Sequence, residues 1–590
     1  MKRTGRVLFI FLIILGCMAG LWLFQSWKDT KNLSDKKTIR NGYITEISGS
    51  SVNVVSDGKQ QVWESASAIT GQAVTGVADL YLQDKKIVRV VKKPETVQGK
   101  ILKISDDVIT LEGYGNVKLD SEFVVYRVAK NGTVSAGSRT DIAVGNTDTR
   151  FVAAGSRLCA AVMPETQMET IRVLLSNNDF SSYQMEKTVL TATTDYTVKI
   201  GKEVSQYKKG QKATFEPGSL SGRALVSTGG RGKIRIETLK RQYGVPEYRG
   251  TIEIEKNGNY LNLVNELPLE EYLYSVVPSE MPTEYEPEAL KAQAVCARSY
   301  AAEHMRGNRM AKYGAHVDDS VSYQVYNNLK EDGRSIAAVN TTKNQVVAYQ
   351  GKIATTYFYS ASCGSTAGTK DVWFTKKEVP YLPSSLQTIP RTTSNLKTEE
   401  AFQDYIRKTP DTVDSTSPWY RWQTVIPQKE IEKTISASIQ RRYQANPTQI
   451  QVKEKDGTYK SRPVTDIGHV KNIEVKSRGA GGVVSMIEIQ GTKETLHVYT
   501  EYNIRTLLIG RSTVFTRKDK KKVTGLNILP SGFFYVKKKG NSYALYGGGY
   551  GHGVGMSQNG ANTLATRKKN YQEILTFYFP GTSVQSRESL

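Results

Sequence analysis

Residues 276–304 read VVPSEMPTEYEPEALKAQAVCARSYAAEH, and the interpretation of the whole chain starts from this stretch. From Pro287 onward it predicts a helix, because proline suits the first helical turn and Glu286 and Glu288 suit the positive end of the helix dipole. Six alanines are spread around nearly the whole circumference of this helix. A helix that is small and apolar on all sides packs closely against several neighbours, so we predict that it is buried at the centre of a domain.

Glu280 stands just before this helix, between Pro278 and Pro282. Both prolines fix their own φ angle, and Met281 is pushed toward extended geometry by the proline that follows it. The pattern predicts a stiff loop that holds one carboxylate beside a buried helix, which suits a catalytic acid. A glutamate in a loop is more often a solvated surface charge, so the local sequence leaves both interpretations open.

The N-terminal residues 1–28 carry the pattern of a membrane anchor. Lys2, Arg3 and Arg6 precede residues 7–24, an apolar run of 18 residues without a charge. This length reaches the lower limit for a membrane-spanning helix, and the basic leader favours a cytoplasmic N-terminus. We expect a single-pass protein of the cell membrane whose body is extracytoplasmic. A cleavable signal peptide is the alternative, although no clean cleavage site follows the apolar run.

The net charge of the 590-residue chain is +23, which favours a polyanionic partner. DNA, anionic lipid and the anionic polymers of a bacterial wall all fit this charge. An outward-facing body makes nucleic acid a poor partner and leaves the wall as the best one. Outside the anchor only Cys159, Cys296 and Cys363 remain, and their number and spacing signal neither a disulfide framework nor a zinc knuckle.

Between the anchor and the central helix the sequence predicts mainly strands. Residues 29–40 form a polar tether, and apolar and polar residues then alternate in pairs of segments within residues 41–160. We predict a small β module there, with a duplicated strand unit as one form of it. A plain β spacer is the simpler interpretation of this module than a specific ligand site. The lysine runs at 518–522 and 537–539 are interpreted as solvated hairpin faces that add at most to the attraction for a polyanion.

Two motifs carry a family resemblance. Residues 264–301 (VNELPLEEYLYSVVPSEMP…EALKAQAVCARSYA) and residues 547–561 (GGGYGHGVGMSQNGA) stand in the order typical of the SpoIID/LytB family, which the chain resembles over about 170–590. These are bacterial cell-wall proteins of sporulation and wall remodelling. The resemblance implies an α+β fold in which a mixed domain with a central buried helix follows the β-rich module. Residues 375–540 are a divergent insertion in that domain.

The resemblance also implies a reaction. SpoIID proteins are described as lytic transglycosylases that act on peptidoglycan strands stripped of their stem peptides by a partner amidase, and Glu280 matches the family's catalytic glutamate. One residue could protonate the leaving oxygen and then take a proton from the C6 hydroxyl of muramic acid, giving a 1,6-anhydro ring. This fits a chain in which motifs point to only one carboxylate, whereas hydrolysis ordinarily takes two. The motif positions suggest the following substrate-binding residues: Arg298, Gln324, Tyr326, Ser360, Ser362, His552 and Gln558.

The same resemblance leaves a metal site in doubt. Many family members carry a His-Cys pair associated with zinc just before a Gln-Val-Tyr sequence, and here Ser322 and Tyr323 occupy those places. His316, Asp318 and Asp319 remain nearby as donors, but such residues in a loop are more often hydrogen-bonding turn residues. We therefore expect neither a metal nor another cofactor.

Two further functions stay open. LytB-type relatives are described as enhancers of wall amidases, so the chain could bind glycan without cutting it. A structural wall-anchoring protein that works through the N-terminal β module is a third possibility. The sequence also leaves open whether the protein acts in sporulation, for instance in engulfment, or in vegetative growth.

Overall fold

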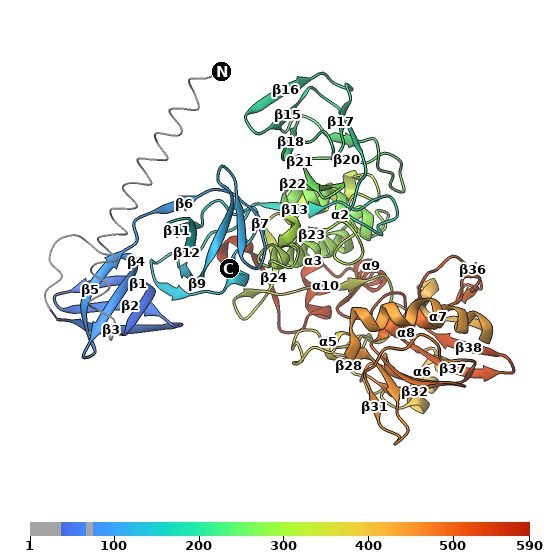
Figure 1. The fold of residues 1–590 in the computed structure, drawn as a ribbon. Helices are drawn as coiled ribbons and strands as arrows, with labels where there is room; N and C mark the ends of the chain where they lie inside the picture. The colour runs from blue at the N-terminus through green and yellow to red at the C-terminus, as the bar shows by residue number, and fades with distance from the viewer. Residues whose placement is uncertain (1–36, 67–74) are drawn as a thin grey trace. The chain divides into compact units, whose positions relative to one another are not determined.

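The computed structural model describes residues 37–66 and 75–590, and these have a mixed α+β fold that is rich in strands (Figure 1). The membrane anchor expected at residues 1–28 lies outside the described residues. Within the described ranges no helix is both long and apolar enough to cross a membrane. The chain divides into two compact units. Unit 1 comprises the described part of Met1–Leu239 together with Glu247–Pro268 and His304–Tyr323, and unit 2 comprises Lys240–Pro246, Leu269–Glu303 and Gln324–Leu590.

Unit 1 begins with a closed five-stranded barrel in the order β1-β2-β3-β5-β4. Its strands are β1 (Thr38–Ser48), β2 (Ser51–Ser56), β3 (Lys59–Ser65), β4 (Gly76–Gln83) and β5 (Lys86–Lys92). Alternate residues such as Ile44, Val52, Val54 and Leu80 point inward and are fully buried. The alternation in the sequence therefore correctly predicted half-buried strands at the start of this region.

A second, seven-stranded sheet follows in the order β6-β11-β12-β9-β8-β7, with β10 paired to β9. Its strands are β6 (Thr96–Gln98), β7 (Ile101–Ile104), β8 (Val108–Leu111), β9 (Gly115–Val128), β10 (Val134–Ala136), β11 (Arg150–Ala154) and β12 (Arg157–Pro164). Ile101, Ile109, Phe151 and Leu158 form the centre of its core. Two similar segments of the sequence, residues 42–55 and 99–113, thus lie in two different sheets.

The rest of unit 1 holds a seven-stranded sheet and a four-stranded sheet. The larger has the order β16 (Glu203–Tyr207), β15 (Tyr196–Ile200), β18 (Ala224–Ser227), β21 (Thr251–Asn257), β22 (Tyr260–Pro268), β13 (Thr170–Leu174), β23 (Val317–Asp318). The smaller has the order β17 (Ala213–Phe215), β14 (Thr188–Ala192), β19 (Ile234–Ile236), β20 (Glu247–Tyr248).

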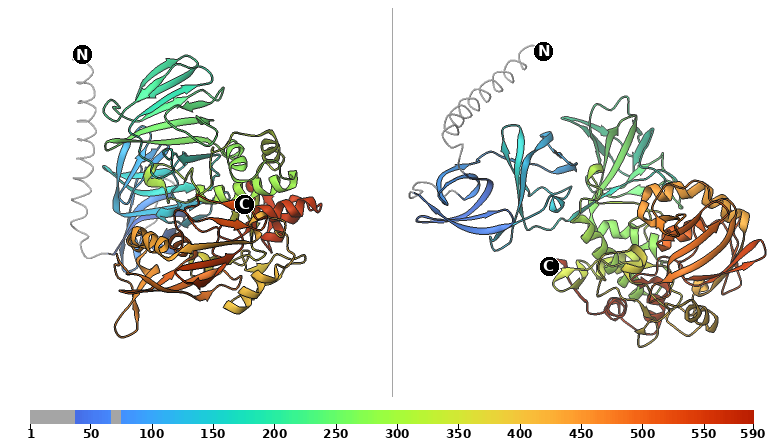
Figure 2. Two further views of the ribbon diagram at one scale, coloured as in Figure 1. Left: turned by 90° about the vertical axis from the view of Figure 1, so that its right-hand side faces the viewer. Right: turned by 60° about the horizontal axis from the view of Figure 1, so that its bottom comes forward.

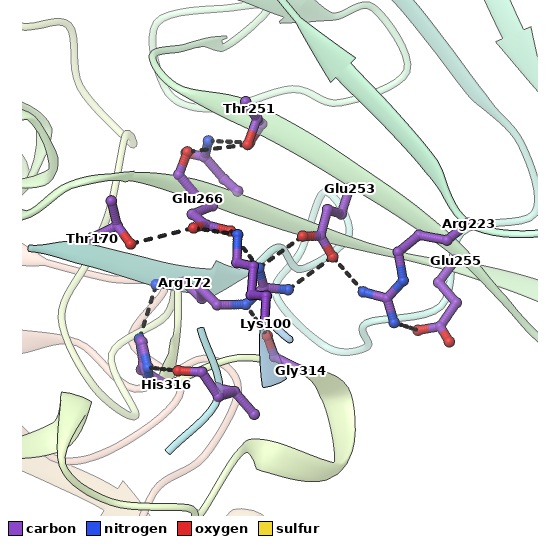
Figure 3. Close-up of polar contacts among 12 residues, drawn as sticks. Lys100, Thr170, Arg172, Arg223, Thr251, Glu253, Glu255, Glu266, Gly314 and His316 are labelled. Carbon is purple, nitrogen blue, oxygen red and sulfur yellow. Dashed lines mark hydrogen bonds and ion pairs between the residues drawn. The ribbon is translucent and has the colours of Figure 1, made fainter. Parts of the chain in front are cut away.

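A buried ion-pair network crosses the larger sheet (Figure 3). The guanidinium of Arg172 on β13 donates to both carboxylate oxygens of Glu253 at 2.7 and 2.8 Å, and also to Glu266. Lys100, which immediately precedes β7, donates to Glu266 at 2.6 Å. Although burial opposes it, the charge of Arg172 lowers the pKa of Glu253 to about 2. The network therefore ties Lys100 and the adjoining β7 to β13, β21 and β22 within unit 1.

Helices dominate the first part of unit 2. They are α2 (Leu269–Glu280), α3 (Pro287–Met305, its last two residues counted in unit 1), α4 (Gly333–Thr341), α9 (Gln558–Thr566) and α10 (Tyr571–Tyr578), with α9 and α10 beside α3 (Figure 1). All six alanines of α3 are buried, so the sequence correctly predicted a helix packed on every side. Three small sheets complete this part. One is three-stranded, with β24 (Gln345–Tyr349) between β25 (Lys352–Ile353) and β40 (Ser583–Ser586). The other two pair β26 (Phe358–Tyr359) with β39 (Met556–Ser557) and β27 (Ser385–Leu386) with β28 (Thr392–Thr393).

Two local predictions in this part are wrong. Glu280 is the last residue of α2 and does not lie in a loop, because the helix continues through Pro278. The turn after Pro278 closes through a hydrogen bond from Met281 N–H to the Val277 carbonyl at 3.0 Å, which a proline near a helix end does not prevent. The aromatic and β-branched residues at 353–360 favour one buried strand by composition, but the structure has only the two-residue strands β25 and β26 there.

The second part of unit 2 contains two five-stranded sheets, drawn in orange and red in Figure 2. The first has the order β36 (Lys522–Val523), β35 (Phe515–Arg517), β29 (Trp422–Pro427), β38 (Ser542–Gly547), β37 (Phe534–Lys539). The second has the order β31 (Tyr459–Lys460), β30 (Ile450–Lys453), β34 (Thr495–Tyr499), β33 (Val484–Gly491), β32 (Val470–Arg478). The helices here are α5 (Thr369–Trp373), α6 (Glu399–Lys408), α7 (Gln428–Ala445) and α8 (Glu501–Leu507). Ile431, Ile435 and Ile439 of α7 join both sheets in one apolar core.

Candidate active site

Glu280 is held by the segment 324–326, which lies against α2 and α3 of unit 2. The main-chain N–H of Val325 donates to Glu280 Oε1 at 2.6 Å. Gln324 fixes the segment from both sides, because its amide donates to the Ala297 carbonyl at 3.3 Å and its oxygen accepts from the Tyr272 hydroxyl at 3.1 Å. The Tyr326 ring packs against the Tyr272 ring at 5.0 Å. Together these contacts aim one backbone donor at the carboxylate.

The surroundings of Glu280 change its acidity. Burial raises the pKa of Glu280 to about 7, and only the hydrogen bond from Val325 works against it. Among the described residues no cation pairs with this carboxylate, and no hydrogen bond reaches Oε2. A carboxyl group whose pKa lies near neutrality can both give and take a proton at physiological pH. The second oxygen is left to carry that proton.

His552 lies in a group of aromatic rings elsewhere in unit 2. Its ring centre is 5.5 Å from that of Tyr359 and 5.2 Å from that of Trp373. Nδ1 accepts a hydrogen bond from the Val554 N–H at 3.1 Å, so the proton of the neutral ring sits on Nε2. Burial, with the charge of Arg505, lowers the pKa of His552 to about 4. The imidazole is therefore a neutral ring fixed by its own loop and poorly suited to supply a proton.

The glycines around His552 are required by packing inside the protein. Gly551 and Gly553 have φ angles of 114° and 81°. A Cβ at Gly551 would lie 2.7 Å from the Tyr359 side chain, and one at Gly553 would lie 2.4 Å from the Phe533 ring. Packing inside the protein therefore accounts for these glycines without any ligand contact.

Asp414 is a functional candidate that the sequence did not indicate. Its fully buried carboxylate accepts hydrogen bonds from the hydroxyls of Ser362 at 2.7 Å and Ser557 at 2.5 Å. Burial raises the pKa of Asp414 to about 6 in spite of these bonds. The residue joins the turn after β26 to the N-terminus of α9. No motif marks it, because it lies in the region interpreted as a divergent insertion.

Arg298 is a brace within unit 2. The side chain is fully buried and donates to both oxygens of Glu270, at 2.9 and 2.7 Å, and to the Val339 carbonyl at 3.1 Å. These bonds connect α3 with the start of α2 and the end of α4. With its donors engaged inside the protein, Arg298 is not available to a ligand, which favours bracing over the substrate contact that the motif suggested.

The other motif residues divide by exposure. Gln324, Tyr326, Ser362 and Gln558 are buried, whereas Ser360 and His552 are partly exposed. The Ser360 carbonyl accepts from the Asn559 N–H at 3.0 Å and so fixes α9. The sequence motifs thus identified mainly the framework of the site.

Helix α3 supports both groups of residues. The Ala297 carbonyl accepts from Gln324 in the Glu280 group. The Cys296 carbonyl accepts from Thr356 at 2.8 Å. The Tyr300 ring lies 5.9 Å from the ring of Tyr357, which contacts His552. Within the described residues no hydrogen bond or ion pair joins Glu280 to His552. The alanine-rich helix is therefore their common base, and a direct proton exchange between them is not built into the structure.

His316 and Asp318, which were considered as metal ligands, make hydrogen bonds to other residues of unit 1. His316 Nδ1 accepts the Arg172 N–H at 3.0 Å, and Nε2 lies 2.8 Å from the Val144 carbonyl. Asp318 accepts from the Tyr183 hydroxyl at 2.8 Å. In residues 37–66 and 75–590, no group of three or more His, Cys, Asp or Glu side chains is arranged to hold a metal ion. His316 serves instead as a hydrogen-bonding link.

Comparison with known proteins finds a family model that matches part of this site. Residues 257–349, which include α2, α3 and the 324–326 segment, match the family model described as stage II sporulation protein, SpoIID. Residues 440–555 match a domain of unknown function. This match overlaps the divergent insertion at 440–540 and continues into the closing glycine-rich motif.

Characterised relatives agree with the first match. The amidase enhancer of Bacillus subtilis is 29% identical over 53% of this chain, and the match spans only 40% of that protein's length. Stage II sporulation protein D of Bacillus amyloliquefaciens is 29% identical over 65% of this chain and 90% of its own length. The B. subtilis stage II sporulation protein D is 28% identical over the same shares. Residues 257–349 thus match a SpoIID domain, and the chain is similar to members of the SpoIID/LytB family.

Proposed function

We propose that the chain is a lytic transglycosylase that cleaves peptidoglycan glycan strands with Glu280 as its single acid and base. The observation that carries the proposal is the environment of Glu280: burial raises its pKa to about 7 while Val325 fixes one of its oxygens. The general link to the cell wall and sporulation comes from the SpoIID family match and from relatives named stage II sporulation protein D.

The reaction needs no water. Protonated Glu280 gives its proton to the glycosidic oxygen, and the bond between that oxygen and C1 of the muramic acid residue breaks. The resulting carboxylate then takes the proton of the C6 hydroxyl, whose oxygen bonds to C1 and closes the 1,6-anhydro ring. The Val325 N–H stays on Oε1 throughout, because Oε2 carries the proton in our scheme. One carboxyl group suffices, since it ends the cycle protonated as it began.

Location and partners are part of the same proposal. The apolar run at residues 7–24 supports a single membrane anchor with an extracytoplasmic body. A relative named amidase enhancer supports a partnership with a wall amidase. We place the protein at the cell membrane, facing the glycan strands that such an amidase has stripped of peptides.

The test is the product released from peptide-free glycan by Glu280→Gln. We expect this variant to release no anhydro ends, because an amide at this position cannot shuttle the proton. Glu284→Gln is the matched control, since Glu284 is exposed four residues further on, and it should act as the wild type does. Circular dichroism spectra of both variants should match that of the wild type, as a check that they fold. Anhydro products from Glu280→Gln at the wild-type rate would contradict the proposal.

The relative named amidase enhancer also favours a second candidate, a protein that binds glycan and stimulates an amidase without cutting. The same assay separates the two. Retention of peptide-free glycan by the wild type without any new ends would identify the non-catalytic enhancer.

A further inference from the structure

One of the two lysine runs interpreted from sequence as solvated hairpin faces lines a surface hollow of unit 2, and the other lies next to two tyrosines that line it. The hollow has a volume of about 260 Å³ and lies where α6 approaches the sheet of β35, β29, β38 and β37. Lys518 of the 518–522 run lines it, together with the preceding Arg517. From the other run, Lys537 lies 5.7 Å from the ring centre of Tyr535, which also lines the hollow. Segments far apart in sequence thus supply cations to one place.

Two arginines from other elements complete the group. Arg407 at the end of α6 is exposed, and the Arg421 guanidinium is held by main-chain carbonyls, including those of Ile406 at 2.9 Å and Cys363 at 2.9 Å. Bonds to carbonyl groups position a guanidinium without cancelling its charge. Arg421 therefore presents a fixed positive charge to the hollow.

Most of these charges have no carboxylate partner. Arg517 is neutralised by Asp519, with which it forms an ion pair at 2.6 Å. In the described part of the chain, no ion pair to a carboxylate occurs for the remaining cations around the hollow, namely Arg407, Arg421, Lys518, Lys537 and Lys539. Uncompensated cations around a concavity concentrate positive potential in it, which attracts anions. The hollow is therefore suited to an anionic ligand.

The arrangement of the lysines indicates a chain-like ligand. Lys537 and Lys539 alternate along β37 on the side of Tyr535, so the cations continue outward from the hollow along one strand. A single small ion would use only the hollow itself. A polymer with one negative charge per repeat would use both the hollow and the lysines beyond it.

The aromatic rings disfavour single-stranded nucleic acid. Tyr535 and Tyr546 stack on each other at 5.1 Å, and Lys537 and Lys539 lie over these two rings. Their faces are thus taken, whereas binding of single strands relies on free aromatic faces on which bases stack. A phosphodiester chain of small polyol or sugar units needs no such face.

We infer that this basic hollow binds the phosphodiester backbone of an anionic wall polymer and so holds the protein on the wall outside its glycan site. The choice of a wall polymer rests on the proposed extracytoplasmic function, whereas the anion-binding chemistry rests on the hollow alone.

The test measures binding of the full-length chain to a synthetic poly(glycerol phosphate) of defined length. The double variant Arg407→Gln/Lys518→Gln should weaken this binding roughly tenfold. It should also flatten the salt dependence of binding, because fewer phosphate contacts form and fewer counterions are then released. Lys455→Gln/Lys460→Gln is the matched control: it removes the same charge from exposed lysines on the β30–β31 hairpin and should leave the affinity within about twofold.

Three results would overturn the inference. The first is an equal loss of affinity in both double variants, which would mean diffuse attraction. The second is equal affinity for a carboxylate polymer of matched length and charge, and the third is tighter binding of an oligodeoxynucleotide. Because binding is read without glycan cleavage, the outcome is independent of whether Glu280 is catalytic.

Discussion

The main-chain N–H of Val325 donates to the carboxylate of Glu280 at 2.6 Å, and it is the hydrogen bond that lowers the pKa of this otherwise desolvated group. The donor comes from the backbone and the acceptor from the end of a helix, so their alignment depends on how the 324–326 segment is clamped. Changes to this segment should therefore act on the acidity of Glu280.

Replacing Val325 by proline removes this donor. Loss of a hydrogen bond to the ionised form raises the pKa of Glu280 further above 7. Cleavage begins from protonated Glu280, so its rate falls as pH rises through this pKa. We expect the falling limb of the pH–rate profile on peptide-free glycan to move to higher pH. Val325→Ala keeps the N–H and should leave the profile in place, and a shift in both variants or in neither would count against the role of this bond.

Asp414 should make the stability of the protein depend on pH. Because its pKa is about 6 when folded, against 3.8 as the reference value, the folded state binds the proton more tightly. The stabilisation is fully present below pH about 4 and is lost as pH rises through about 6, a change of about 3 kcal/mol. Asp414→Asn should flatten the urea-unfolding free energy across this window.

The control for that prediction is Asp411→Asn, three residues earlier on the exposed surface. This variant should retain the wild-type dependence on pH. An unchanged slope in Asp414→Asn would show that the buried carboxylate does not take up a proton in this range.

Arg298 and Glu270 should behave as a coupled structural pair. Removing one partner leaves the other charge without its ion pair, so Arg298→Ala should destabilise the fold by about 3 kcal/mol. A double-mutant cycle with Glu270→Ala should give a coupling energy above about 1 kcal/mol. At temperatures where the variants are folded, KM for glycan should be unchanged. A raised KM for Arg298→Lys without loss of stability would assign Arg298 to the substrate instead.

Gly553 should tolerate no side chain. Its φ is 81°, and an added Cβ would meet the Phe533 ring at 2.4 Å, so Gly553→Ala carries both backbone strain and a clash. Gly525 has a φ of 80° with nothing within 4 Å of the added Cβ, and Gly525→Ala should cost only about 1 kcal/mol. We expect Gly553→Ala to lower the midpoint of thermal unfolding clearly more than the control does. An equal fall in the unfolding midpoint of both variants would mean that the added Cβ at Gly553 does not clash with the Phe533 ring.

The sequence predicted elements that local pattern controls. The alanine-rich composition of α3 and the alternation in β1 and β2 specify burial directly, and both elements formed as expected. The loop position predicted for Glu280 was wrong because Pro278 and Pro282 were interpreted as signs of a stiff loop, whereas tertiary packing carries α2 through Pro278. Local sequence pattern predicts a helix end poorly where tertiary packing determines whether the helix continues.

The site shows the same division. The motifs led to Glu280 and to the segment that contacts it because both lie in stretches that resemble the family, although 45 residues separate Glu280 from Val325. Asp414 was missed because it lies outside these motifs, and nothing local marks a carboxylate that hydrogen bonds to Ser362 and Ser557 will hold in the interior. The basic hollow was missed for the same reason, because each lysine run alone looks like a solvated surface.

Digestion of peptide-free glycan in H₂¹⁸O, followed by mass spectrometry of the new ends, tests the central role of Glu280 most directly. If its carboxyl group shuttles one proton while the sugar's own C6 hydroxyl attacks, the new ends are 1,6-anhydro rings that contain no ¹⁸O. Reducing ends that carry one ¹⁸O atom would show that water is the nucleophile and would contradict this account.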